Sequence, residues 1–188
     1  MNYDHALMGL RWIHFVAGVT WIGMLYFFNL VNVPFAKTMD GDTKKKVVPE
    51  LMPRALWWFR WGAMVTFLSG LSYLFVQYFR VNPDGSMGLN GPQGMFHTIS
   101  GKWISLGAAL GTIMWFNVWF IIWPIQKKVI AGVKGAGPTV DAGVIRKAFL
   151  ASRLNMYLSM PMLFCMASAS HFQVDPFPLA FPIAAVAG

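Results

Sequence analysis

Long stretches without a charged side chain alternate with short charged segments along this chain. Four stretches contain no Asp, Glu, Lys or Arg: Trp12–Ala36, Trp61–Phe79, Trp103–Gln126 and Leu154–Val174. A bilayer core is about 30 Å thick, and a helix needs about 20 apolar residues to cross it. Even the shortest stretch, Trp61–Phe79, is close to this length. The pattern predicts an all-α integral membrane protein with a four-transmembrane-helix bundle.

The charged segments set the expected boundaries of this bundle. We expect helices near 9–35, 55–80, 97–126 and 148–172, joined by loops at Lys37–Arg54, Arg80–Gly101 and Lys127–Arg153. Residues 1–174 then form a single membrane domain. The segment 175–188 has three prolines and no charge after Asp175, so it cannot span and is predicted to be an outer tail.

Basic residues are distributed unevenly between the two sides of the predicted bundle. Twelve of the fifteen Lys and Arg lie in the first and third loops and the helix ends beside them; the other three are Arg11, Arg80 and Lys102. Cytoplasmic loops carry an excess of Lys and Arg. We therefore expect both termini on the outer (periplasmic) side of an inner, or cytoplasmic, membrane.

Composition agrees with a membrane location. Only 12% of the residues are charged, about half the usual share of a soluble domain. The net charge of +8 does not indicate nucleic-acid binding, because the cations flank apolar helices instead of forming a patch on a soluble fold.

All four histidines fall on the predicted outer side, and two of them share a depth. Counted along the helices, His14 is about 30 Å from Pro34 and His171 is about 27 Å from Arg153, both measured from the cytoplasmic edge. Two imidazoles at one depth on different helices suit the axial positions of a haem iron. We therefore predict haem b between His14 and His171, with His97 or Lys102 as substitute ligands.

Small residues and cations near these histidines fit the same hypothesis. Gly18 lies one helical turn from His14, and Ala167–Ser170 precede His171, so a porphyrin would have room. The three outer cations, Arg11, Lys102 and Arg80, would pair with the propionates. The alternative is that each histidine is an interfacial residue bonded to a loop or headgroup, and that Lys102 only snorkels.

Two further clusters have alternative interpretations. His5, Met8, Met95 and His97 could form a copper site on the outer side. Deeper in the predicted bundle lie four amides, which would bond helices together or bind a quinone or a small polar substrate: Asn29, Asn32, Asn117 and Asn155.

The first and third helices share a weak internal repeat. One opens Arg-Trp-Ile at Arg11 and closes Pro34-x-x-Lys37, and the other opens Lys-Trp-Ile at Lys102 and closes Pro124-x-x-Lys127. Two related helical hairpins would explain the repeat. The chemistry of the membrane interface would explain it as well, because tryptophan is enriched there.

Five segments of the sequence resemble the membrane domain of the bacterial urate hydroxylase (urate oxidase N-terminal) family: LRWIHFVAGVTWIGMLYFFN, MPRALWWFRWGAMVTFLSG, NVWFIIWPIQKKVI, SRLNMYLSMPMLF and ASHF. A more distant likeness is to the membrane protoporphyrinogen oxidase family and to copper-resistance membrane proteins. In the protoporphyrinogen oxidase family a first-helix Leu-His motif and a third-helix lysine are implicated at haem b. By position, this likeness implies roles for His14 and Lys102.

Three functions follow as expectations. The first is a b-type cytochrome that relays electrons between membrane or periplasmic partners such as a cytochrome c or a quinone. The second is a membrane oxidase of urate or a porphyrinogen, and the third is an accessory subunit of a larger respiratory or photosynthetic complex. The urate enzymes carry a cytochrome c domain, but Cys165 is the single cysteine here. A separate carrier would therefore be needed for the electrons.

Overall fold

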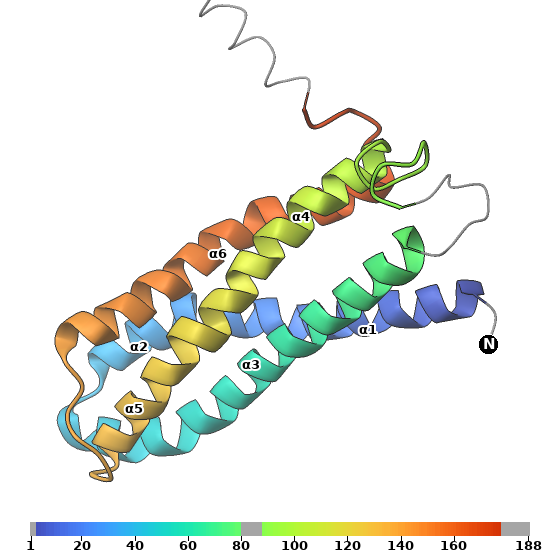
Figure 1. The fold of residues 1–188 in the computed structure, drawn as a ribbon. Coiled ribbons are helices and arrows are strands. Elements are labelled where there is room, and N and C mark those ends of the chain that lie inside the picture. Colours follow the sequence, from blue (N-terminus) through green and yellow to red (C-terminus); the bar gives the residue numbers. More distant parts are fainter. Residues whose placement is uncertain (1–2, 80–87, 178–188) are drawn as a thin grey trace, which may run out of the picture.

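The described residues form four helical rods and no strand. The computed structural model describes residues 3–79 and 88–177. Three segments make the first rod and three make the third, because the helix continues through a π-helical stretch in each (Figure 1). The bounds are α1 Tyr3–Tyr26, η1 Phe27–Asn32, α2 Val33–Thr38, α3 Gly41–Tyr78, α4 Ile99–Phe116, η2 Asn117–Ile122, α5 Trp123–Val133 and α6 Ala142–His171.

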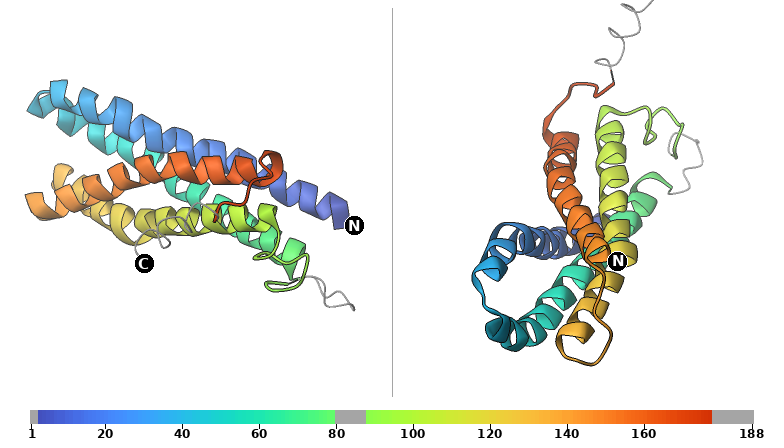
Figure 2. Two further views of the ribbon diagram at one scale, coloured as in Figure 1. Left: turned by 90° about the horizontal axis from the view of Figure 1, so that it is seen from above. Right: turned by 90° about the vertical axis from the view of Figure 1, so that its left-hand side faces the viewer.

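The rods pair into two antiparallel hairpins. α1 packs along α3, and α4 packs along α6 (Figures 1 and 2). We call the end with the α2–α3 and α5–α6 connections the basic end, and the opposite end the terminal end. The start of α1 and the end of α6 both lie at the terminal end, toward which α1 and α6 diverge (Figure 1).

α3 is longer than the sequence predicts. It starts at Gly41, so the predicted start near 55 was too late and most of the expected first loop is helical. Asp40 caps this helix by accepting hydrogen bonds from the backbone N–H groups of Asp42 at 2.9 Å and Thr43 at 2.8 Å. The hydrogen bonds from Thr43 hold the pKa of Asp40 below its ordinary value. The lysines of the predicted first loop that follow Gly41 therefore lie on α3.

Two π-helical stretches occupy matching places in the hairpins. Each precedes a proline: Phe27–Asn32 comes before Pro34, and Asn117–Ile122 comes before Pro124. Proline lacks an N–H and its ring clashes with the carbonyl four residues earlier, so a wider turn relieves the conflict. A π-helical stretch before a proline occurs once in each hairpin, so the internal repeat in the sequence has a structural counterpart.

Three of the rods are long and apolar enough to cross a membrane. They cover Tyr3–Thr38, Gly41–Tyr78 and Ile99–Val133 among the described residues. α6 is not one of these three, and it carries charged and polar residues such as Arg153, Asn155 and Ser159. An apolar environment such as a bilayer accounts for the many large hydrophobic side chains that all four rods expose.

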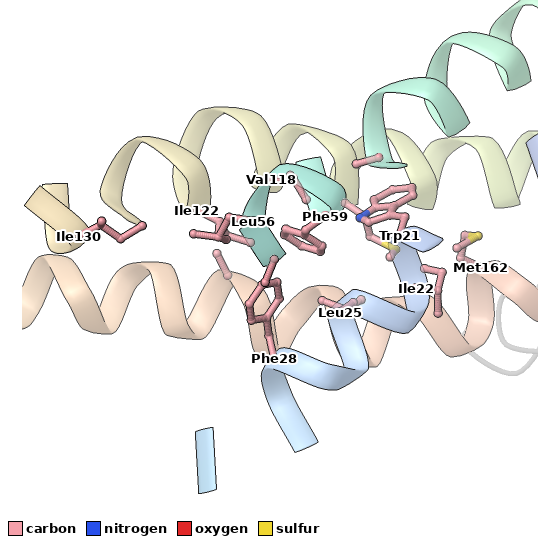
Figure 3. Packing of buried hydrophobic residues seen from close by; sticks show 14 residues of the cluster. Trp21, Ile22, Leu25, Phe28, Leu56, Phe59, Val118, Ile122, Ile130 and Met162 are labelled. Carbon is pink, nitrogen blue, oxygen red and sulfur yellow. The ribbon is translucent and has the colours of Figure 1, made fainter. Parts of the chain in front are cut away.

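Large side chains fill the half of the bundle near the basic end (Figure 3). Leu25 and Phe28 of the first rod meet Leu56 and Phe59 of α3 in this core, and the rings of Phe28 and Phe59 pack edge to face at 5.4 Å. Toward the terminal end many buried positions are small or polar, although Tyr78 and Met95 are also buried there. The small or polar ones are Thr66, Ser69, Gly107, Cys165, Ser168 and Ala169.

Small residues bring α1 and α3 into close contact. A Cβ atom placed on Gly62 would lie 3.1 Å from the backbone nitrogen of Trp21 and 3.4 Å from the carbonyl oxygen of Ala17. In a membrane, helices associate through such close packing and through hydrogen bonds, because lipid is as apolar as the side chains. The α1–α3 interface therefore depends on the absence of a side chain at Gly62.

We predict that Gly62→Val destabilises the protein by about 1–3 kcal/mol, the usual cost of overpacking. Gly23→Val is the matched control, because a Cβ at Gly23 meets no atom within 4 Å. Unfolding by a denaturing detergent in mixed micelles measures both free energies. Equal losses in the two variants would contradict the importance of the α1–α3 contact.

Candidate functional site

His14 of α1 is hydrogen-bonded to the backbone of α3. Its Nδ1 atom lies 2.8 Å from the carbonyl oxygen of Thr66. A carbonyl oxygen only accepts hydrogen bonds, so Nδ1 must carry the hydrogen. A neutral imidazole held in this way keeps a lone pair on Nε2, which can bind a metal ion.

Gly70 makes room for this ring. A Cβ atom on Gly70 would lie 2.9 Å from Cε1 and 3.0 Å from Nδ1 of His14, closer than real Cβ contacts. Gly18 also faces α3, and a Cβ there would meet Cγ2 of Thr66 at an ordinary 3.8 Å. Gly18 thus lies in the helix interface with His14, and Gly70 is the glycine that touches the imidazole.

The carbonyl that accepts from His14 belongs to a polar patch on α3. Ser69 is buried, and its hydroxyl lies 3.1 Å from the same Thr66 oxygen. The hydroxyl of Thr66 donates to the carbonyl of Gly62 at 2.7 Å. These bonds keep the patch satisfied and leave the Thr66 carbonyl fixed in place for His14.

His171 lies at a depth close to that of His14 but does not contact it. Tyr26 of α1 and Ser159 of α6 are joined by a 3.0 Å hydrogen bond, and the spacing from Tyr26 back to His14 equals that from Ser159 on to His171. Counting instead from the bond between Asn29 and Ser152 places His171 about 6 Å farther toward the terminal end than His14. The two histidines are therefore level to within about one helical turn. The side chain of His171 is exposed where α1 and α6 diverge.

Two of the three predicted outer cations have protein partners. Arg11 donates a hydrogen bond to the hydroxyl of Tyr73, and its guanidinium carbon lies 5.2 Å from the centre of that ring. Lys102 forms an ion pair with Asp175. Arg80 lies outside the described residues. Arg11 precedes His14 by three residues on α1, and its partner Tyr73 belongs to α3 of the same hairpin. Lys102 belongs to the α4–α6 hairpin.

Residues 172–177, the terminal strap, cross the start of α4. Besides the Lys102–Asp175 pair, the indole N–H of Trp103 donates to the carbonyl of Val174 at 2.9 Å. The side chain of Asp175 also accepts from the backbone N–H of Phe177 at 3.0 Å. The hydrogen bond from Lys102 lowers the pKa of Asp175, and the bond from Phe177 acts in the same direction. This part of the predicted tail is therefore tied to the bundle.

The predicted copper residues differ in their exposure. His5 and His97 are exposed, while Met95 is buried and Met8 is exposed. Within residues 3–79 and 88–177, no three His, Cys, Asp or Glu side chains lie close enough to hold a metal ion.

The deeper amides mostly bond to other parts of the bundle. Asn117 donates to Asn155 at 2.8 Å, and Asn155 donates to the carbonyl of Met114 at 2.9 Å. Asn29 donates to the carbonyl of Leu25 at 2.9 Å and to the hydroxyl of Ser152. These bonds match the structural interpretation of the cluster, in which amides join helices.

Sequence reasoning missed Thr66, Gly70 and Asp175. The signal for the first two was present, because Gly62, Thr66 and Gly70 recur at every fourth position and so lie on one helix face. Asp175 could not be paired from sequence, since its partner Lys102 is distant along the chain.

The chemistry at His14 fits a haem. Metal-binding histidines usually donate their second ring N–H to a carboxylate or a backbone carbonyl, as His14 does to Thr66. The small buried residues of the terminal half are the kind that lets a flat group approach the helices. The cations fit less well, because Lys102 already pairs with Asp175.

Comparison with known proteins identifies one family. A family model described as urate oxidase N-terminal matches residues 41–87 and 93–181, which is well over half of the chain. The matched ranges include α3 to α6 but not α1, which carries His14. No curated protein and no solved structure gives a significant match.

We predict that acid releases the terminal strap. The pKa of Asp175 is lowered from its ordinary value of 3.8, so the ionised carboxylate stabilises the attached strap at any pH above 3.8. This contribution is lost as the pH falls below 3.8 and through the lower pKa of the folded protein. Lys102→Met should release the strap at neutral pH. A spin label at Gln173→Cys reports its mobility, and Lys134→Met at the basic end is the control. A label equally immobile in Lys102→Met and in the control would contradict the attachment.

Proposed function

The chain belongs to the urate oxidase N-terminal family, and from the geometry at His14 we propose that it is a membrane b-type cytochrome. In this proposal all four rods cross an inner membrane with both termini on the periplasmic side. Haem b lies in the terminal half of the bundle and serves to relay electrons between redox partners.

One observation carries this proposal: the Nδ1 atom of His14 is bound to the Thr66 carbonyl at 2.8 Å. The bond determines the tautomer, so Nε2 is the nitrogen available to iron. It also raises the basicity of the ring as a ligand.

In this proposal His171 would hold the haem together with His14. Support comes from its depth, which matches that of His14 to within about one helical turn. The exposed imidazole at the last residue of α6 has no hydrogen bond within the described residues that would have to break. Because α1 and α6 diverge at this level, binding would draw the two hairpins together.

The roles of the protein residues follow from burial and orientation. A bound haem b would supply one-electron exchange. His14 would hold it through Nε2, the Thr66 carbonyl would keep the ring oriented, and Gly70 would leave space for that orientation. The apolar surroundings would exclude water and tune the reduction potential. Arg11 beside Tyr73 would offer one cation for a propionate.

The partners we propose are the lipid bilayer and a separate electron carrier, such as a cytochrome c or a quinone. The proposed site lies near the terminal end, which supports a periplasmic carrier. To reach a carrier at the basic end, electrons would have to cross the core of large side chains. Twelve of the fifteen Lys and Arg residues lie at the basic end, which supports the placement of that end in the cytoplasm.

A second candidate function is oxidation of a substrate at this haem. The family name favours urate, and the sequence likeness adds porphyrinogens as another substrate class. Arg11 and Tyr73 lie about one turn from His14 and Gly70 along their helices, and they could bind an anionic ring such as urate. Turnover of urate with release of product would distinguish this function from simple relay.

We predict that His14→Ala abolishes haem binding, whereas His97→Ala keeps it. His97 is exposed in the loop before α4, so its loss should change neither the fold nor the site. Purification after expression with haem available, followed by pyridine haemochrome quantitation, gives the haem content of each variant. A normal haem content in folded His14→Ala would refute the assignment.

A second prediction separates the role of Gly70 from that of Gly18. Gly70→Ala should displace the His14 ring and lower haem occupancy or change the low-spin spectrum, because the new Cβ would lie 2.9 Å from Cε1. Gly18→Ala should leave the spectrum unchanged, since its Cβ has an ordinary contact. Thermal unfolding of both variants checks that the fold persists. Identical spectra would show that the ring orientation in the structure is not the one that matters.

A further inference from the structure

Two cations lie beside the indole of Trp123 at the basic end. The guanidinium carbon of Arg60 on α3 is 3.8 Å from the ring centre, and the Nζ of Lys127 on α5 is 5.4 Å from it. Contacts at these distances are cation–π interactions. The two residues come from different rods, which lie side by side here (Figures 1 and 2). The fold therefore brings two like charges together around one ring.

No acidic side chain among the described residues neutralises this pair. Four acidic residues lie at the basic end, and all have other partners: Asp40 and Asp141 cap helices, Asp42 pairs with Lys45, and Glu50 pairs with Arg54. The Nε atom of Arg60 is buried and has no hydrogen-bond partner in the described part of the chain. An anion is therefore the group that this arrangement lacks.

The position of the pair indicates which anion. The part of α3 from Arg60 to its last residue, Tyr78, is about 27 Å long. This distance is close to the thickness of a bilayer core, about 30 Å. Arg60 also directly precedes the uncharged stretch Trp61–Phe79. The cations thus lie where apolar helix surface gives way to charge, which is the level of lipid headgroups.

We propose that Arg60, Lys127 and Trp123 form a binding site for the phosphate of an anionic phospholipid. The guanidinium offers several N–H donors to phosphate oxygens, and the lysine adds a point charge. Basic pockets between transmembrane helices commonly bind such headgroups. A bound lipid would bridge α3 and α5, and so would join the two hairpins at the end opposite the proposed haem. The proposal does not depend on haem binding.

The test compares neighbouring lysines that differ in position on one helix. Lys127 and Lys128 are both exposed on α5, so Lys127→Gln and Lys128→Gln each remove one charge and leave the Arg60–Trp123 stack intact. The proteins are reconstituted in phosphatidylcholine nanodiscs that contain phosphatidylglycerol, and the retained lipid is counted by native mass spectrometry. Either substitution removes the general attraction of one basic residue to an anionic surface, so the difference between the variants reports the direct contact. We expect Lys127→Gln to retain about tenfold less phosphatidylglycerol than Lys128→Gln, the factor for one hydrogen bond to a charged group.

Three results would overturn the proposal. Equal losses in both variants would show attraction by the general positive charge instead of a site. No preference of the original chain for phosphatidylglycerol over phosphatidylcholine would show that no anionic lipid is held. Thermal stabilisation by inorganic phosphate in pure phosphatidylcholine, lost in Lys127→Gln and without phosphatidylglycerol retention, would assign the site to a soluble phosphate compound.

Discussion

The close approach of α1 to α3 is the constraint on which the candidate site depends. Small residues at Gly62 and Gly70 let the two backbones come near enough for His14 to reach the Thr66 carbonyl at 2.8 Å. That carbonyl is an acceptor only, so the contact decides which ring nitrogen is free. Helix packing and ligand chemistry are thus one feature, since a side chain in this interface would change both.

The two halves of the bundle have different tasks. Large side chains such as Phe28 and Phe59 pack near the basic end and hold the hairpins together. π-helical turns before Pro34 and Pro124 occur at matching places in both hairpins. Toward the terminal end more of the buried residues are small, and α1 and α6 diverge (Figure 1). A core of large side chains at one end therefore holds the hairpins together, while α1 and α6 separate toward the other end.

Much of this fold could be predicted because uncharged stretches reveal apolar helices directly. The ends of these helices were harder to predict. α3 begins as early as Gly41 because Asp40 caps it, and a cap shortly before a run of lysines carries little sequence signal. The similar depth of His14 and His171 was predicted by counting residues. The Tyr26–Ser159 contact places them level, whereas the Asn29–Ser152 contact places His171 about one turn farther toward the terminal end. Contacts across the bundle could not be predicted. The pairing of Lys102 with Asp175 and of Arg60 with Trp123 depends on which rods are neighbours.

The most direct test of the account is an absorption spectrum of the purified chain, oxidised and then reduced with dithionite, with pyridine haemochrome quantitation. The account predicts haem b in equal amount to protein, with the sharp reduced bands of a six-coordinate, low-spin iron. A folded protein, expressed with haem available, that shows no Soret band would contradict the proposal that the interface around His14 exists to hold haem.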